Sequence, residues 1–188
     1  EQIDNLAEYQ NAVAKIKQHV NRAGTITHRL LGFSRKISAE YDVQVNEVLK
    51  ETLSFLENEA HGNNIALNLQ LDENLPTIRT EGSQVQQVLL NLIENALDAV
   101  GSDGQIDIIT TRTKDELHVQ IADNGPGIKP EVMKKLWEPF FTTKEPGKGT
   151  GLGLSICSDI AHKLGGTITA ENRPQGGAVF TLKLPLRG

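Results

Sequence analysis

The polar face of one predicted helix holds the side chains best suited to bind a cation. Residues 83–100 are strongly periodic, and at about 100° per residue their apolar side chains gather on one face. The opposite face has side-chain oxygens and neither Lys nor Arg; its members are Gln84, Gln87, Asn91, Glu94, Asn95 and Asp98. Asn is a poor helix former, so Asn91 and Asn95, one turn apart, suggest a row of ligands. Such oxygens suit a hard cation such as Mg²⁺, although a merely polar surface would give the same pattern.

A second candidate is the stretch IADNGPGI, residues 121–128. An apolar strand is predicted to end at Asp123, after which Gly125 and Gly127 bend the backbone. A carboxylate at a strand end, next to glycines, can accept a hydrogen bond in a pocket that side chains leave open. The alternative is an ordinary Asn-Gly turn without a function.

A third candidate is the stretch LWEPFFTTKEPGKGTGLGLSI, residues 136–156. Its aromatic residues, Trp137, Phe140 and Phe141, predict an anchor for a lid over 142–150. Gly149, at the end of the lid, and then Gly151 and Gly153 lead into a helix whose free N–H groups attract anions. GKGT breaks the Walker A pattern with an extra glycine, and the dinucleotide pattern lacks its third glycine. The stretch therefore predicts a third kind of phosphate loop, in which bare backbone at Gly151 and Gly153 meets phosphate oxygens.

The elements that must position these residues follow from the periodicity of the chain. Strands are predicted at 64–71, 105–113, 116–123, 165–172 and 177–185, with short extended pieces near 42 and at 77–80. Helices are predicted at 46–60, 83–100, 130–138 and 151–164. The strands come in adjacent pairs instead of alternating strictly with helices. This order predicts an α+β two-layer sandwich with a mixed, mainly antiparallel sheet.

The first part of the chain differs in character, and we divide the chain into residues 1–40 and 41–188. Residues 3–38 lack proline and carry an a/d heptad pattern, with Leu6, Val13, Val20, Thr27 and Ser34 in one series and Tyr9, Ile16, Ala23, Leu30 and Ile37 in the other. A lone helix cannot bury such a stripe. We expect a partner helix from outside this fragment or from another subunit; the alternative is that the helix lies on its own globular domain.

Composition restricts the classes of function. The 188 residues carry a net charge of −5, which disfavours a broad nucleic-acid surface. One cysteine, Cys157, excludes an internal disulfide framework. No apolar run approaches the roughly 20 residues that span a bilayer, and we see no signal peptide, so a cytoplasmic setting is expected. The chain starts at Glu1 and is interpreted as a fragment of a longer protein, for which membrane anchoring outside this fragment is left open.

Four ordered motifs resemble a known family. NLIENALDA, DNGPGI, PFFTTK and GTGLGLSI are similar to the N, G1, F and G2 boxes of the ATP-binding domain shared by sensor histidine kinases, gyrase-type ATPases, heat-shock-90 chaperones and MutL proteins. RAGTITHRLLGFSRK, residues 22–36, resembles the second helix of the histidine kinase dimerisation hairpin. The motif sequences NALDA and EPFFTTK are most similar to those of the nitrogen-regulation-type subgroup of kinases. The resemblance covers nearly the whole chain and implies the Bergerat-type ATP-binding fold.

The resemblance also implies roles for single residues. Asn95 is similar to the Mg²⁺ ligand, Asn91 to a residue near the phosphates, and Asp123 to the carboxylate that accepts a hydrogen bond from the adenine amine. Thr181 stands where the family has a threonine near the adenine. The remaining residues expected to contact ATP are Asp98, Gly125, Gly127, Ile128, Phe141, Thr142, Thr143, Gly149, Thr150, Gly151, Leu152, Gly153 and Leu154. Lys144 and Lys148 are added as candidate phosphate contacts on their charge, and Asn91, Asn95 and Lys144 form the expected catalytic set.

One position separates the branches of this family. In the ATPase branch a glutamate four residues before the metal-binding Asn activates water, and here that position is Asn91, which cannot act as a base. Glu94 lies about 100° around the helix from Asn95. We therefore expect phosphoryl transfer, in which positioning and charge neutralisation do most of the catalysis. The alternatives are a gyrase- or MutL-like ATPase and a serine kinase of the anti-sigma type.

The acceptor histidine of the family is not found in its expected motif. The five histidines are His19, His28, His61, His118 and His162, and none lies in a sequence like His-Glu-Leu-Arg-Asn-Pro. We therefore expect the fragment to bind Mg-ATP but to show little autophosphorylation. The resemblance implies two partners. One is a response regulator receiver domain, and the other is a second subunit, which forms a homodimer with this one through the helical hairpin.

Overall fold

The computed structural model describes residues 40–145 and 149–186. The predicted heptad helix at 3–38, with His19 and His28, lies outside these residues, as does Lys148. Among the residues described, none of the helices combines the length and apolar character needed to cross a membrane.

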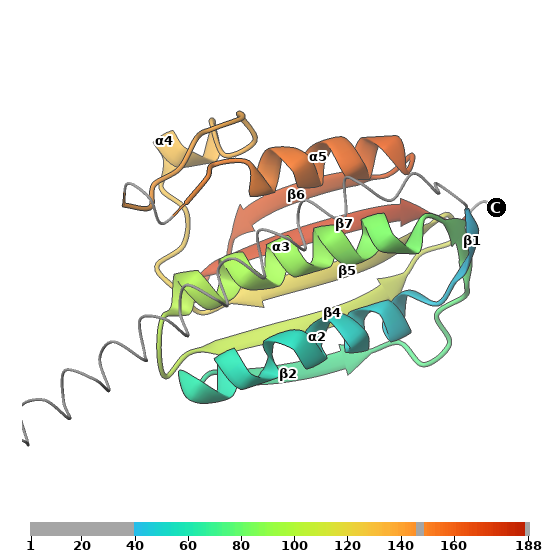
Figure 1. Ribbon diagram of the computed structural model, residues 1–188, viewed down its shortest axis with the longest axis horizontal. Coiled ribbons are helices and arrows are strands. Elements are labelled where there is room, and N and C mark those ends of the chain that lie inside the picture. The colour runs from blue at the N-terminus through green and yellow to red at the C-terminus, as the bar shows by residue number, and fades with distance from the viewer. Residues whose placement is uncertain (1–39, 146–148, 187–188) are drawn as a thin grey trace, which may run out of the picture. The chain divides into compact units, whose positions relative to one another are not determined.

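A five-stranded sheet forms one layer (Figure 1). Its strands are β2 (Ala66–Leu71), β4 (Gln105–Arg112), β5 (Glu116–Asp123), β6 (Thr167–Asn172) and β7 (Ala178–Pro185). The order across the sheet is β2-β4-β5-β7-β6, in which β2 runs parallel to β4 and all other neighbours are antiparallel. A separate two-stranded ladder pairs β1 (Tyr41–Val43) with β3 (Ile78–Thr80). The predicted mixed, mainly antiparallel α+β sheet is confirmed.

Three helices cover one face of this sheet (Figure 1). They are α2 (Val45–Gly62), α3 (Gly82–Val100) and α5 (Gly153–Lys163). The predicted apolar face of α3 supplies much of the core, because Val88, Leu89, Leu92 and Ile93 are fully buried. Burying apolar surface stabilises the fold by roughly 25 cal/mol per Å², so this face fixes the rotation of α3 and directs its polar face away from the core.

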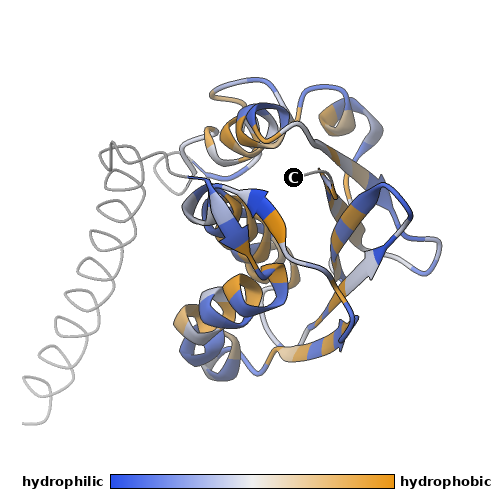
Figure 2. Ribbon diagram, turned by 90° about the vertical axis from the view of Figure 1, so that its right-hand side faces the viewer, coloured by the Kyte–Doolittle hydropathy of each residue, from blue (hydrophilic) through white to orange (hydrophobic). Residues whose placement is uncertain are grey.

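The strands alternate between a core face and an outer face (Figure 2). In β4, Ile106 and Ile108 are buried under the helices, whereas Asp107 between them is only partly buried. Successive side chains of a strand point to opposite faces. The register therefore decides on which face each polar residue lies, which matters for the site described below.

The helix predicted at 130–138 is much shorter in the structure. The helix α4 spans only Pro130–Met133. The following backbone forms three-residue turns, in which Lys135 N–H donates to the carbonyl of Val132 and Glu138 N–H to that of Lys135. Pro139 follows immediately and has no N–H to donate, so the helical ladder does not continue.

Candidate functional site

The polar face of α3 meets the first residue of α5. Asn91 is only 5% exposed although its side chain is polar. A Cβ atom on Gly153 would lie 3.4 Å from Asn91 Oδ1. The helices α3 and α5 also contact through Cys157, whose Sγ lies 3.9 Å from the carbonyl oxygen of Val88. The structure thus brings together Asn91 of the predicted cation-binding face and Gly153 of the predicted phosphate loop.

A lysine of the predicted lid reaches the same face of α3. Lys144 Nζ donates to the Asp98 carboxylate and lies 3.5 Å from Asn95 Oδ1. Carboxamide and carboxylate oxygens thus already face a positive charge here, which is the donor chemistry that Mg²⁺ prefers. No cluster of three His, Cys, Asp or Glu side chains suited to a metal is found within 40–145 and 149–186. Mg²⁺ usually keeps several waters and takes one or two protein oxygens plus phosphates, so Asn95 fits as its ligand.

Negative charge accumulates beside this face. Partial desolvation of Glu59 on α2, followed by the charges of Asp98 and Glu94, raises the pKa of its carboxyl group above 4.5. A cation placed near Asn95 would relieve this repulsion.

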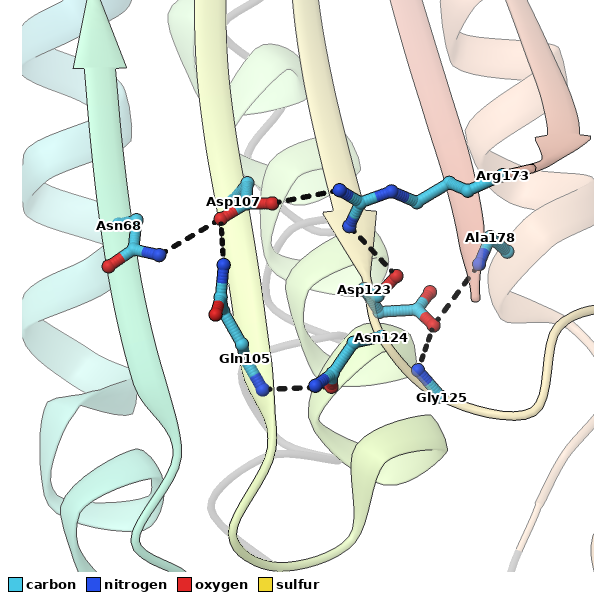
Figure 3. Close-up of polar contacts among 8 residues, drawn as sticks. All are labelled: Asn68, Gln105, Asp107, Asp123, Asn124, Gly125, Arg173 and Ala178. Carbon is cyan, nitrogen blue, oxygen red and sulfur yellow. Dashed lines mark hydrogen bonds and ion pairs between the residues drawn. The ribbon is translucent and has the colours of Figure 1, made fainter. Parts of the chain in front are cut away.

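Asp123 lies at the end of β5 and is 2% exposed. Its Oδ1 accepts hydrogen bonds from the backbone N–H of Gly125 at 2.9 Å and of Ala178 at 3.2 Å (Figure 3). Two such donors offset the cost of burying a carboxylate. Within the described part of the chain Oδ2 has no hydrogen-bond partner, and it therefore remains able to accept one from a ligand.

The glycines after Asp123 are required by the protein itself. A Cβ on Gly125 would lie 2.8 Å from the carbonyl oxygen of Ala99, and Gly127 has a φ of +75°, which favours glycine. Ile128 is fixed through both of its backbone groups, because its N–H donates to Asn172 Oδ1 and its carbonyl accepts from Asn172 Nδ2, each at 2.7 Å. The motif is thus a shaped loop packed against α3 and the end of β6.

Sequence reasoning missed the residues that hold this loop. Arg173 donates to the carbonyl oxygen of Asp123 and to Asp107, each at 3.1 Å (Figure 3). Hydrogen bonds from Asn68 and Gln105, followed by the contact with Arg173, lower the pKa of Asp107 below 3.8. Asn172 and Arg173 are more than 40 residues from their partners, and no local pattern marks such a contact.

The residues at the two ends of the predicted lid lie against each other. Gly151 has a φ of +67°, and a Cβ there would overlap the backbone of Phe140. A Cβ on Gly149 would lie 2.6 Å from Thr142 Oγ1. These two glycines therefore allow the end of the lid to pack against its start, and of the three glycines only Gly153 faces Asn91.

The predicted aromatic anchor is only partly correct. Trp137 packs edge-on against Phe180, with ring centroids 6.3 Å apart. Phe140, however, is 75% exposed and has a φ of +66°, because the turn there places its side chain in solvent. Leu136 is buried instead. The other lid and loop residues, which are Phe141, Thr142, Thr143, Thr150, Leu152 and Leu154, are exposed or partly buried and remain candidate contacts.

Thr181 is not brought to Asp123. The register pairs Thr181 with Gln120 and Phe180 with Ile121. Asp123 lies two residues after Ile121, so its side chain shares the face of Phe180, whereas that of Thr181 points to the opposite face. The residue of β7 that contacts Asp123 is Ala178. The structure therefore does not place Thr181 beside Asp123, as the resemblance had led us to expect.

None of the three described histidines has a hydrogen bond to Asn91, Asn95, Lys144 or Asp123 in the described part of the chain. His61 is exposed near the end of α2, His118 pairs with Glu116 at 3.0 Å, and His162 Nδ1 lies 2.9 Å from the carbonyl oxygen of Ser158. These contacts give each of them a local structural role or a surface position.

Comparison with known proteins defines the class of this domain. The model of the histidine kinase-, DNA gyrase B-, and HSP90-like ATPase family matches residues 80–188, more than half of the chain, and the chain belongs to this family. Its similarity is to the histidine kinase branch. Sensor histidine kinase ZraS of Klebsiella oxytoca is 34% identical over 173 residues, which cover 91% of this chain and 37% of that protein. Sensor protein KdpD of Escherichia coli is 35% identical over 179 residues, covering 92% and 20%.

Solved structures agree with this assignment. The catalytic domain of histidine kinase ThkA superposes with a TM-score of 0.72 at 34% identity, covering 79% of this chain and 99% of that one. ThkA in complex with the response regulator TrrA gives a TM-score of 0.72 at 31% identity, covering 91% and 49%. The chain is thus an ATP-binding catalytic domain of the histidine kinase type, and it spans well under half the length of these curated relatives.

Proposed function

We propose that this domain transfers the γ-phosphoryl group of Mg-ATP to a histidine on the first helix of a dimerisation hairpin, which is not among the five histidines of this chain. The observation that carries the proposal is Asn91, buried on the polar face of α3 opposite Gly153. A carboxamide has no basic lone pair with which to activate water, and the acceptor, a neutral imidazole, needs no strong base. Transfer to histidine is therefore favoured over hydrolysis.

The described residues divide the work between base and phosphates. Asp123 Oδ2 accepts from the adenine amine, while Gly125 and Gly127 give the loop beside it the shape that its packing requires. The N-terminus of α5 at Gly153 offers backbone N–H groups to the phosphates. Asn95 holds Mg²⁺, which when bound neutralises charge on the phosphate oxygens. Lys144 must leave Asp98 and Asn95 for this to happen, and its ammonium group is then available to a phosphate oxygen.

The finer assignments concern the rest of the protein. We propose that residues 1–40 form the second helix of a dimerisation hairpin and that residues 41–188 form the catalytic domain. The motifs NALDA and EPFFTTK favour the nitrogen-regulation-type subgroup. We further propose a homodimer that relays phosphate to a response regulator receiver domain in the cytoplasm, where ATP is found; ThkA has been solved with such a partner.

Phosphotransfer in trans tests this function. The chain is incubated with Mg²⁺ and γ-labelled ATP, with and without a separately purified hairpin that carries an acceptor histidine. We expect acid-labile, base-stable label on the hairpin and little on the chain itself. Steady release of phosphate, unchanged by the hairpin, would instead identify an ATPase.

A further inference from the structure

The turn between β6 and β7 holds the loop after β5 from two sides. Asn172 lies on the side of Ile128 and clamps both backbone groups of that residue. Arg173, the next residue, contacts the carbonyl oxygen of Asp123. A Cβ on Gly177, at the end of the turn, would overlap that same carbonyl group. The turn is therefore packed directly against the end of β5.

Arg173 approaches Asp123 on the outer face of the sheet, the face opposite the helices. The register pairs Asp107 with Ala122 and Ile106 with Asp123, so the side chains of Asp107 and Asp123 point to opposite faces. The guanidinium group that bridges Asp107 and the Asp123 carbonyl lies on the outer side (Figure 3). The free Oδ2 of Asp123 lies on the side of the helices, and the strand separates Arg173 from it.

The outer anchor of this bridge is itself tightly held. Asp107 accepts from Asn68 Nδ2 at 2.9 Å and from Gln105 Nε2 at 2.7 Å. The side chains of Arg173 and Asp107 are only 19% and 14% exposed, so the ion pair is shielded from water far better than a surface pair. The chain of contacts runs from β2 across β4 to the end of β5 (Figure 3).

We propose that Arg173 is a positioning residue for adenine recognition, which fixes the end of β5 through the Asp107 bridge so that Asp123 Oδ2 faces the exocyclic amine. This inference rests on the proposed function, in which Asp123 reads that amine. Hydrogen bonds weaken steeply as their angle departs from linear. A small rotation of the Asp123 backbone would thus weaken the contact with the amine while leaving the fold intact.

A comparison of two nucleotides tests the inference. Calorimetry on the full 188-residue chain measures the dissociation constants of ATP and of purine riboside triphosphate, which lacks the 6-amino group, for wild type, Arg173→Met and Arg173→Lys. Arg112→Met is the matched control, since Arg112 pairs with Asp72 at the other end of β4. Wild type and the control should favour ATP by about tenfold or more, the effect of one hydrogen bond to a charged group.

In Arg173→Met the preference for ATP should fall to within about threefold, mostly through weaker ATP binding. Arg173→Lys should retain part of the preference, because lysine keeps the charge but cannot bridge two oxygens. Asp107→Asn, which leaves Arg173 and Asp123 in place, should lower the preference less than Arg173→Met, and it decides the matter if the methionine variant does not fold. A wild type that binds both nucleotides equally would contradict the role of Asp123. A wild type that discriminates, with folded Arg173 and Asp107 variants that discriminate equally well, would overturn the role of Arg173 alone.

Discussion

The two ends of the candidate site are built differently. At the base end, residues 123–128, side chains bond to backbone groups, as in the contacts of the buried Asp123 with Gly125 and Ala178. At the phosphate end, formed by Asn95, Asp98 and Lys144, the contacts join the tips of side chains, and those of Lys144 and Asp98 are 36% and 54% exposed. Exposed ion pairs contribute little to stability.

Because of this difference, we expect the two ends to rearrange to different extents when the proposed ligand binds. In the proposed binding mode, Asp123 Oδ2 at the base end is already free to accept from adenine, so binding there should need little reorganisation. At the phosphate end, Lys144 faces the oxygens that a metal would use, and binding must replace these contacts. On this proposal, the base end is preorganised for recognition, whereas the catalytic arrangement forms only when the ligand binds.

The sharpest way to break the base end is Asp123→Asn. The amide oxygen can still accept from Gly125 and Ala178, but an NH₂ group then faces the adenine amine, so donor meets donor. We expect the affinity for ATP to fall about 100-fold, the preference to shift towards inosine triphosphate, and the melting temperature to change little. Calorimetry with both nucleotides measures this, with the exposed Asp115→Asn as control. Undiminished ATP binding would show that the base does not contact this carboxylate.

At the phosphate end, Asn95→Ala removes the expected metal ligand. Wild type should bind ATP more tightly with Mg²⁺ than with a chelator present. In the variant we expect this dependence on Mg²⁺ to fall by about tenfold or more, because phosphate oxygens and water alone remain as ligands. The control is Asn58→Ala on the exposed face of α2. If Asn95→Ala keeps the full Mg²⁺ dependence, the metal is held elsewhere.

Local sequence patterns predicted much of this arrangement. The features that depend on contacts between distant parts of the chain were not predicted. The 3.6-residue period of α3 was sufficient to place Val88 and Leu92 in the core and Asn91 on the polar face. Thr181 was misplaced because which face a strand residue occupies depends on register, and a shift of one residue reverses it. Asn172 and Arg173 were missed because their partners are brought to them only by the order of β5, β7 and β6 in the sheet.

Gly151 and Gly153, which follow the lid, can be compared by replacing each with alanine. We expect the first change to affect stability and the second to affect ligand binding. Gly151→Ala forces a side chain into left-handed backbone and against the backbone of Phe140, and should lower the free energy of unfolding by at least about 1–2 kcal/mol. Gly153 has no positive φ, and its added methyl group would make only ordinary contact with Asn91 at 3.4 Å.

Gly153→Ala should therefore leave the free energy of unfolding unchanged or slightly higher, since alanine favours helix, yet weaken ATP binding where phosphates approach Asn91. Denaturant unfolding and calorimetry on both variants separate the two effects. Wild-type ATP affinity in Gly153→Ala would refute the requirement for bare backbone at that position.

The two ends also contain acids whose pKa values shift in opposite directions. Asp107, behind the base end, has a lowered pKa because Asn68, Gln105 and Arg173 favour its charged form. Its stabilising effect is present above the unfolded value of 3.8 and is lost as the pH falls through the lower folded value. Glu59, beside the phosphate end, has a pKa raised above 4.5 by desolvation and by its acidic neighbours. Stability therefore decreases as the pH rises through its folded value.

Glu59→Gln should accordingly raise the melting temperature slightly at pH 7, where the ionised carboxylate is unfavourable in the folded state. The side chain of Glu59 is exposed, so we expect the free energy of unfolding to rise by no more than about 0.5 kcal/mol. The gain should vanish below pH 4.5 as Glu59 becomes protonated in both states. Thermal unfolding between pH 4 and 7, with Glu57→Gln on the same helix as control, measures this. An equal gain in both variants, or one independent of pH, would mean that the acidic face of α3 does not act on Glu59.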